Sequence, residues 1–174
     1  VQRQVEKITI GGNIADGDRF QLQLNELSSI REIEYTTPVI EYVAGTSGSG
    51  SDESLALTAD PDGAVDTGDE VFDQQLVRTK VRDELVLKIN AAAALGKNGQ
   101  FVTASADPSD DNSILIVSEG EGDPFELFNV SSSNNAVGFT QAEITPNTPN
   151  DAEEKRIRLD FKDNTLNTGM SVRA

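Results

Sequence analysis

Apolar and polar residues alternate along several short stretches of the chain. The clearest is segment 19–25, RFQLQLN, in which every second residue is apolar. Segments 5–10 (VEKITI) and 156–162 (RIRLDFK) have the same period. A period of two is typical of a strand with one buried face. We therefore expect strands at all three places.

Segment 30–43, IREIEYTTPVIEYV, alternates in two parts. Ile33 and Tyr35 share one face of the first part, and Ile40 and Tyr42 share one face of the second. Pro38 lies between the parts, and proline cannot donate a hydrogen bond to a neighbouring strand. The pattern predicts two strands separated by a break or a sheet edge.

Further strand signals follow in segments 100–106, 113–118 and 125–130. Segment 113–118, SILIVS, has four apolar residues in a row, so both of its faces are apolar. Strands that are covered on both sides have this composition. We expect it to be a central, fully buried strand.

One segment has a helical period instead. Val77, Val81, Leu85 and Ile89 recur every four residues, and most of the charged residues lie elsewhere on the helical wheel. Four alanines follow, and Gly96 stands where a left-handed C-cap is expected. The pattern predicts a long amphipathic helix at about 69–95.

These elements together predict an α+β fold, with mostly antiparallel sheet and the helix packed on one face. A β-sandwich with one covering helix is the alternative. In this interpretation residues 1–144 form a single domain. Residues 145–174 form a linker and a terminal β-hairpin, which belongs to the same sheet or to a neighbouring module.

The residue types that are absent narrow the chemistry. The 174 residues include no cysteine, so disulfides, thiol nucleophiles and thiolate metal sites are excluded. They include no histidine, which removes the Ser-His-Asp triad, the imidazole base and ordinary zinc sites. Carboxylates, lysines, hydroxyls and oxygen-bound cations remain, and we expect a protein that is not an enzyme.

The formal net charge of −16 indicates which partners to expect. Nucleic acids and anionic membranes are bound mainly through lysine and arginine, so neither is expected as a partner. No apolar run approaches the length of a membrane span, and membrane insertion is not expected. Other copies of the chain, or neighbouring subunits of an assembly, are the expected partners.

The sequence AVDTG at 64–68 resembles the motif that carries the catalytic aspartate of aspartic proteases. Here Asp69 and Glu70 follow at once, and the helical pattern begins. Aspartate and threonine side chains commonly accept hydrogen bonds from the free N–H groups of a first helical turn. We interpret Asp66, Thr67 or Asp69 as a helix cap, and we expect no catalytic residue.

Acidic residues crowd three segments of the chain. Calcium takes six to eight oxygen ligands, which clustered carboxylates in glycine-containing loops supply. The candidate ligands lie in the first segment, DPDGAVDTGDE: they are Asp60, Asp62, Asp66, Asp69 and Glu70. The second segment contains Asp107, Asp110 and Asp111, and the third contains Glu119, Glu121 and Asp123. The alternative interpretation is a solvated acidic surface without bound metal.

The middle of the chain resembles a motif of flagellar proteins. Gly68-Asp69 at the helix start, Ile89-Asn90-Ala91 late in the helix, and the strand residues VTAS (102–105) and LIVS (115–118) are similar to the outer domains of flagellins and hook-associated proteins. Segment 8–25 also resembles the opening of modules repeated in bacterial surface proteins and phage tail proteins. The resemblance covers about residues 5–130, and it implies an architectural module without catalytic residues.

We therefore expect a non-enzymatic structural module of an extracellular filament, a surface protein or a phage tail. Its location would be the extracellular space, the cell surface or a virion. The alternative is a calcium-dependent adhesion or glycan-binding module that uses the acidic loops.

Overall fold

The computed structural model describes residues 2–15, 17–44 and 70–147, with the backbone alone for residues 70–73. This part of the chain contains one helix and eight strands, and the fold class is α+β, as predicted. The elements are β1 (Val5–Ile10), β2 (Arg19–Leu27), β3 (Ile33–Thr36), β4 (Ile40–Val43), α1 (Glu70–Ala93), β5 (Val102–Ala106), β6 (Ser113–Ser118), β7 (Phe125–Ser132) and β8 (Phe139–Thr145).

The strands form two antiparallel sheets. In the first sheet the order is β5-β6-β1-β8, so β1 pairs with two strands that lie more than a hundred residues later in the chain. In the second sheet β2 is central. It pairs with β7 along one side, and with β4 and then β3 along the other. The break at Pro38 therefore separates two short strands on the same edge, as the sequence predicts.

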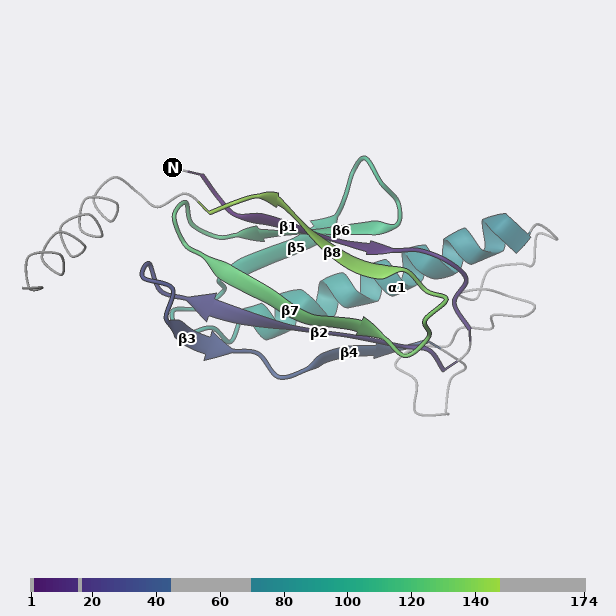
Figure 1. The fold of residues 1–174 in the computed structure, drawn as a ribbon, viewed down its shortest axis with the longest axis horizontal. Coiled ribbons are helices and arrows are strands. Elements are labelled where there is room, and N and C mark those ends of the chain that lie inside the picture. Colours follow the sequence, from purple (N-terminus) through teal and green to yellow (C-terminus); the bar gives the residue numbers. More distant parts are fainter. Residues whose placement is uncertain (1, 16, 45–69, 148–174) are drawn as a thin grey trace, which may run out of the picture.

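The helix links the two sheets. The sheets approach each other along β7 and β8, whereas α1 packs against β5 of the first sheet and β4 of the second. Figure 1 shows α1 running along the long axis of the molecule, beside the strands of both sheets. The chain thus forms two layers of strand with one helix covering the side where the sheets diverge.

The core lies between these three parts. All four predicted helix positions, Val77, Val81, Leu85 and Ile89, are fully buried. They pack in one cluster with buried residues from both sheets. The rings of Phe20 on β2 and Phe139 on β8 meet edge to face, with centroids 5.3 Å apart. Burial of this apolar surface is the main favourable contribution to folding.

Three side-chain amides bond to backbone groups in the way a neighbouring strand does. In each pair the amide N–H donates to a backbone carbonyl, and the amide oxygen accepts from the N–H of the same residue. The pairs are Gln4 with Phe125, Gln74 with Ile14, and Asn90 with Ala104, with N···O distances of 2.8–3.5 Å. They connect α1 to β5 and to the segment after β1, and the start of β1 to β7.

The sequence prediction for β3 is partly wrong. The strand forms, and Tyr35 packs its ring against Phe101, but Ile33 is 62% exposed. The register shifts between Leu27↔Ile33 and Glu26↔Tyr35, which leaves one extra residue on β3. Such a bulge reverses the alternation of faces, so Ile33 and Tyr35 no longer point to the same side.

The prediction for β6 is correct in position and wrong in burial. The strand lies between β5 and β1, as expected for a central strand. Ile114 and Ile116 face the core and are fully buried, whereas Leu115 and Val117 on the other face are only half-buried. The helix packs on one side of this sheet, and among residues 2–15, 17–44 and 70–147 no second helix covers the other side.

The predicted role of Gly96 is also wrong. The helix ends in tight turns in which Leu95 and Gly96 donate to carbonyls three residues earlier, and the left-handed glycine is Gly99, at a φ of 97°. Glycine is required at position 96 because a side chain would not fit there. A Cβ at this position would lie 2.5 Å from the Gly99 carbonyl oxygen and 2.7 Å from the Phe101 ring.

The predicted linker and terminal hairpin at 145–174 lie outside the described residues, apart from the three residues that end β8 and follow it.

Candidate functional site

The best-defined polar cluster lies at the turn between β5 and β6. Asp107 starts this turn, and its Oδ1 accepts hydrogen bonds from the backbone N–H of Ser109 at 2.8 Å and from the Ser109 hydroxyl at 2.7 Å. Aspartate side chains commonly stabilise turns by accepting from a residue two positions on. The side chain is only 7% exposed.

Asp110 repeats this arrangement within the same turn. Its Oδ1 accepts from the Asn112 N–H at 3.0 Å, and its Oδ2 accepts from the Ser113 hydroxyl at 2.7 Å. The backbone N–H of Asp110 in turn donates to the Asp107 carbonyl. Each carboxylate therefore has its own pair of donors inside the turn.

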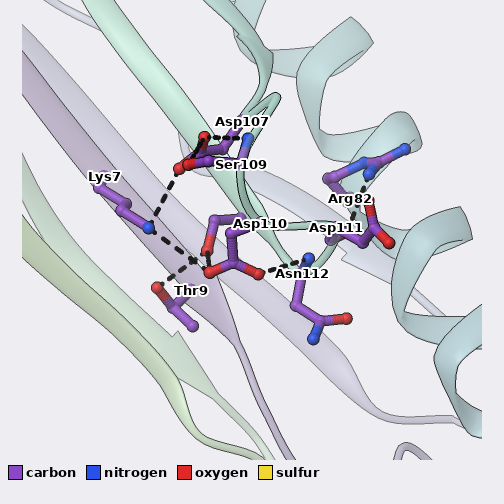
Figure 2. Close-up of polar contacts among 9 residues, drawn as sticks. Lys7, Thr9, Arg82, Asp107, Ser109, Asp110, Asp111 and Asn112 are labelled. Carbon is purple, nitrogen blue, oxygen red and sulfur yellow. Dashed lines mark hydrogen bonds and ion pairs between the residues drawn. The ribbon is translucent and has the colours of Figure 1, made fainter.

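The cation of this cluster comes from a distant part of the chain. Lys7 on β1 extends toward the turn, and its Nζ lies 3.0 Å from Asp107 Oδ2 and 3.4 Å from Asp110 Oδ2 (Figure 2). The ammonium group lies within ion-pair distance of both carboxylates. The pairing of β1 with β6 brings it there.

The hydrogen bonds and charges shift the pKa values in a consistent direction. The Ser109 N–H and hydroxyl, followed by Lys7, lower the pKa of Asp107 from 3.8 to about 2. The Ser113 hydroxyl and the Asn112 N–H lower the pKa of Asp110. Asp107 raises the pKa of Lys7 from its ordinary value. All three groups are therefore held in their charged forms, which suits a structural ion cluster rather than an acid–base pair.

The pH dependence of stability should report this cluster. Because the folded-state pKa of Asp107 is depressed, its stabilising effect is complete above the ordinary pKa of 3.8 and is lost as the pH falls toward about 2. We expect the melting temperature of wild type to exceed that of Asp107→Asn near neutral pH. The difference should shrink as the pH falls through this window, as measured by circular dichroism. If the melting temperatures of wild type and Asp107→Asn changed with pH in parallel, the stabilising role of this ion cluster would be contradicted.

The outer side of the same turn is fixed to the helix. Arg82 donates from Nη1 to the Asp111 carbonyl at 2.8 Å (Figure 2). Arg78 donates from Nη1 to the Gly12 carbonyl at 2.7 Å and from Nε to the Asn112 side chain at 3.3 Å. The residue that accepts from Arg78 has to be a glycine, because Gly12 has a φ of 75° and a Cβ there would lie 2.4 Å from the Ala136 carbonyl oxygen. These two arginines thus bond to the β5–β6 turn and to the segment after β1, and they hold α1 against the first sheet.

A second acidic region lies near the other end of the helix. A cleft of about 360 Å³ there is lined by Glu26, Glu34, Glu119 and Asp123, among others. The backbone N–H of Lys97 donates to Glu26 at 2.7 Å, and the Lys97 ammonium group lies 3.5 Å from Glu34. The Thr103 hydroxyl donates to Glu119. Three of the four carboxylates are therefore already bonded within the protein.

The structure does not bring either described acidic segment together as a metal site. Among residues 2–15, 17–44 and 70–147, no group of three or more acidic side chains is placed to hold a metal ion. Four of the predicted calcium ligands, Asp60, Asp62, Asp66 and Asp69, lie outside the described residues. Glu70 is described only by its backbone, as the first residue of α1. Calcium binding by these five residues stays a prediction, as does the capping of the helix by Asp66, Thr67 or Asp69.

An apolar groove runs between β4 and the C-terminal half of α1. It has a volume of about 540 Å³, and its apolar walls come from Pro38, Val39 and Ile40 on one side and from Ala91, Ala92 and Leu95 on the other. Val39 is 54% exposed and Leu95 is 67% exposed. Arg19, Glu41 and Lys88 form its polar border. This surface is suited to contact with another apolar surface.

Sequence reasoning did not find Lys7 or the groove. Lys7 and Asp107 are a hundred positions apart, and only the pairing of β1 with β6 brings them together. The groove combines residues of a short edge strand with helix positions that a core-facing pattern ignores. The apolar residues at positions 91 and 95, spaced by four, were the local sequence signal for it.

Comparison of the chain with protein-family models, with curated protein sequences and with solved structures found no match. In the part of the chain that the structure describes, no helix is long and apolar enough to cross a membrane.

Proposed function

We propose that the chain is a non-enzymatic structural module of an extracellular filament, a surface protein or a phage tail. One observation supports the non-enzymatic part of this proposal: in the cluster at the β5–β6 turn, the ionisable groups are bonded to one another and to turn backbone. Lys7, Asp107 and Asp110 neutralise each other and fix the β5–β6 turn against β1. An acid–base catalyst instead needs a group whose pKa lies near the working pH and that can reach a substrate.

The arrangement of the surface supports the same proposal. The acidic side chains Asp111, Glu119 and Glu121 are exposed in the turns between strands, while the groove between β4 and α1 offers an apolar contact surface. The resemblance of the helix and the following strands to flagellar outer domains also favours an architectural role. The partners of such a module are other copies of it or neighbouring subunits.

The net charge predicts how assembly should respond to ions. Copies that each carry a charge of −16 repel one another, and salt screens this repulsion. We expect particle size, measured by dynamic light scattering, to increase with salt or with millimolar calcium, and chelation or low salt to reverse the increase. Assembly that is indifferent to both ions would contradict this role for charge. A chain that stays monomeric under all of these conditions would contradict self-assembly.

A further inference from the structure

One buried carboxylate lies outside the ion cluster, on the face of β1 that packs against the core. Glu6 is only 8% exposed, and it shares this face with Ile8 and Ile10, which are fully buried. The Gln4 amide donates to Glu6 Oε1 at 3.1 Å, and the same nitrogen donates to the Phe125 carbonyl at 2.8 Å. A buried charge normally needs several hydrogen bonds or an opposite charge, whereas Glu6 has one donor among the described residues.

The residue directly across from Glu6 is a second carboxylate. Glu6 pairs with Glu143 of β8, and opposite residues of an antiparallel pair point to the same face, with Cβ atoms about 4.5–5.5 Å apart. Like charges in this position oppose the pairing of their strands. β8 is an edge strand, and residues 140–144 are all exposed. The repulsion therefore acts on a strand that is paired on one side only.

In the part of the chain that the structure describes, no cation is paired with either carboxylate. The residues that β6 and β7 contribute here are apolar: Ile116 lies opposite Glu6 in the β1–β6 pairing, and Phe125 accepts from the same amide. Lys7, the next residue along β1, points to the other face, where the two carboxylates of the β5–β6 turn bind it. The charged group that acts on Glu6 is thus Glu143.

We propose that Glu6 and Glu143 form a pH-sensitive contact between β1 and the edge strand β8, which holds β8 more firmly when Glu6 carries a proton. Protonation removes the like charge, and it removes the cost of a buried charge that has one donor. Loss of the proton weakens the pairing, so β8 opens more often as the pH rises. The contact works within a single copy of the chain, so the inference goes beyond the proposed function and does not depend on it.

The direction of this pH dependence follows from the pKa of Glu6. Burial raises this pKa from its ordinary value of 4.5, the Gln4 hydrogen bond lowers it in part, and Glu143 raises it. A raised pKa in the folded state gives a stabilising effect that is complete below the ordinary pKa and is lost as the pH rises through the raised value. Asp107 has the opposite sign, because its pKa is lowered and its effect is lost as the pH falls.

Hydrogen exchange of the β8 backbone amides, measured by NMR on the full chain from about pH 4 to 8, tests the contact. Each rate is divided by the intrinsic exchange rate at that pH, so that it reports the opening of the strand. We expect opening in wild type to increase above pH 4.5 by up to about tenfold per pH unit, because one proton is released, and then to level off. Glu6→Gln keeps the shape of the side chain without its charge. It should lack this increase, and its β8 should open less than that of wild type at neutral pH.

Two further variants separate the contact from the overall charge of the chain. Glu143→Gln removes the facing charge at an exposed position, so β8 should open less at neutral pH and its pH dependence should be smaller. Glu126→Gln is the matched control. It removes one negative charge from an exposed position on β7, where the residue opposite on β2 is Asn25 and not an acid. We expect this control to keep the opening and the pH dependence of wild type.

Four results would overturn the proposed contact, and none of them depends on whether the chain assembles. The first is opening of β8 in wild type that does not increase above pH 4.5. The second is an equal change in Glu6→Gln and Glu126→Gln, which would show a general effect of net charge. The third is faster exchange of β8 in Glu6→Gln than in wild type at neutral pH, which would mean that the charged carboxylate stabilises the strand. The fourth is unchanged opening in Glu143→Gln, which decides the question even if Glu6→Gln does not fold.

Discussion

Replacing Leu85 with alanine should lower the free energy of unfolding by about 2–5 kcal/mol, the usual range for removing a buried leucine side chain. Leu85 is fully buried in the middle of α1, in the cluster that joins the helix to both sheets. The loss has two parts: the favourable free energy of burying the removed methyl groups is no longer gained, and the cavity that they leave costs packing contacts. Urea unfolding followed by circular dichroism measures it.

Leu87→Ala is the matched control for this variant. The substitution is the same and lies on the same helix two residues away, but Leu87 is 63% exposed. Surface substitutions usually change stability by less than about 0.5 kcal/mol. Equal losses in the two variants, measured on the monomeric protein at low salt, would contradict the orientation of α1.

Replacing Asn90 with alanine should destabilise the domain by about 2–4 kcal/mol, because two backbone groups lose their partner. The Asn90 side chain donates to the Ala104 carbonyl at 2.9 Å and accepts from the Ala104 N–H at 2.8 Å. Ala104 lies on the outer edge of β5 and is only 3% exposed, so water does not readily replace the lost bonds. Thermal and urea unfolding measure the effect.

Gln75→Ala is the control for the amide. Gln75 is on the same helix, and its side chain makes one long, exposed hydrogen bond of 3.4 Å to Asp111. We expect a small loss of stability for this variant, well below that of Asn90→Ala. A similar small loss in both would mean that the Asn90 amide does not complete the edge of β5.

The parts of the fold that sequence predicted are the local ones. The burial of Val77, Val81, Leu85 and Ile89 follows from a period set by the helix itself. The alternation in 19–25 predicted β2 for the same reason, since neighbouring side chains of a strand point to opposite faces. The α+β class followed from adding these local elements together.

The parts that sequence missed depend on contacts between distant segments. The pairing of β1 with β6 and β8 cannot be inferred from period alone, and the Lys7 cluster depends on it. A bulge on β3 turned Ile33 outward. Position 96 holds a glycine because a side chain there would collide with Phe101, and not because its φ requires one. The calcium prediction at Asp60, Asp62, Asp66, Asp69 and Glu70 concerns side chains outside the described part, so it stays a prediction.

One element of the resemblance gains a physical explanation. In the motif Ile89-Asn90-Ala91, the isoleucine is buried in the core, the asparagine pairs with the edge of β5, and the exposed alanine lines the groove between β4 and α1. Three neighbouring residues thus serve the interior, the sheet edge and the outer surface. Their relation to flagellar modules is still a proposal.

Hydrogen exchange at the backbone amide of Ala104, followed by NMR, tests most directly whether α1 completes the edge of the first sheet. An edge amide without a partner exchanges quickly, whereas one bonded to the helix opens only with a larger unfolding event. We expect slow exchange in wild type, comparable to the amides of β6, and fast exchange in Asn90→Ala. Fast exchange in the wild-type protein would contradict the position of the helix and the architecture built on it.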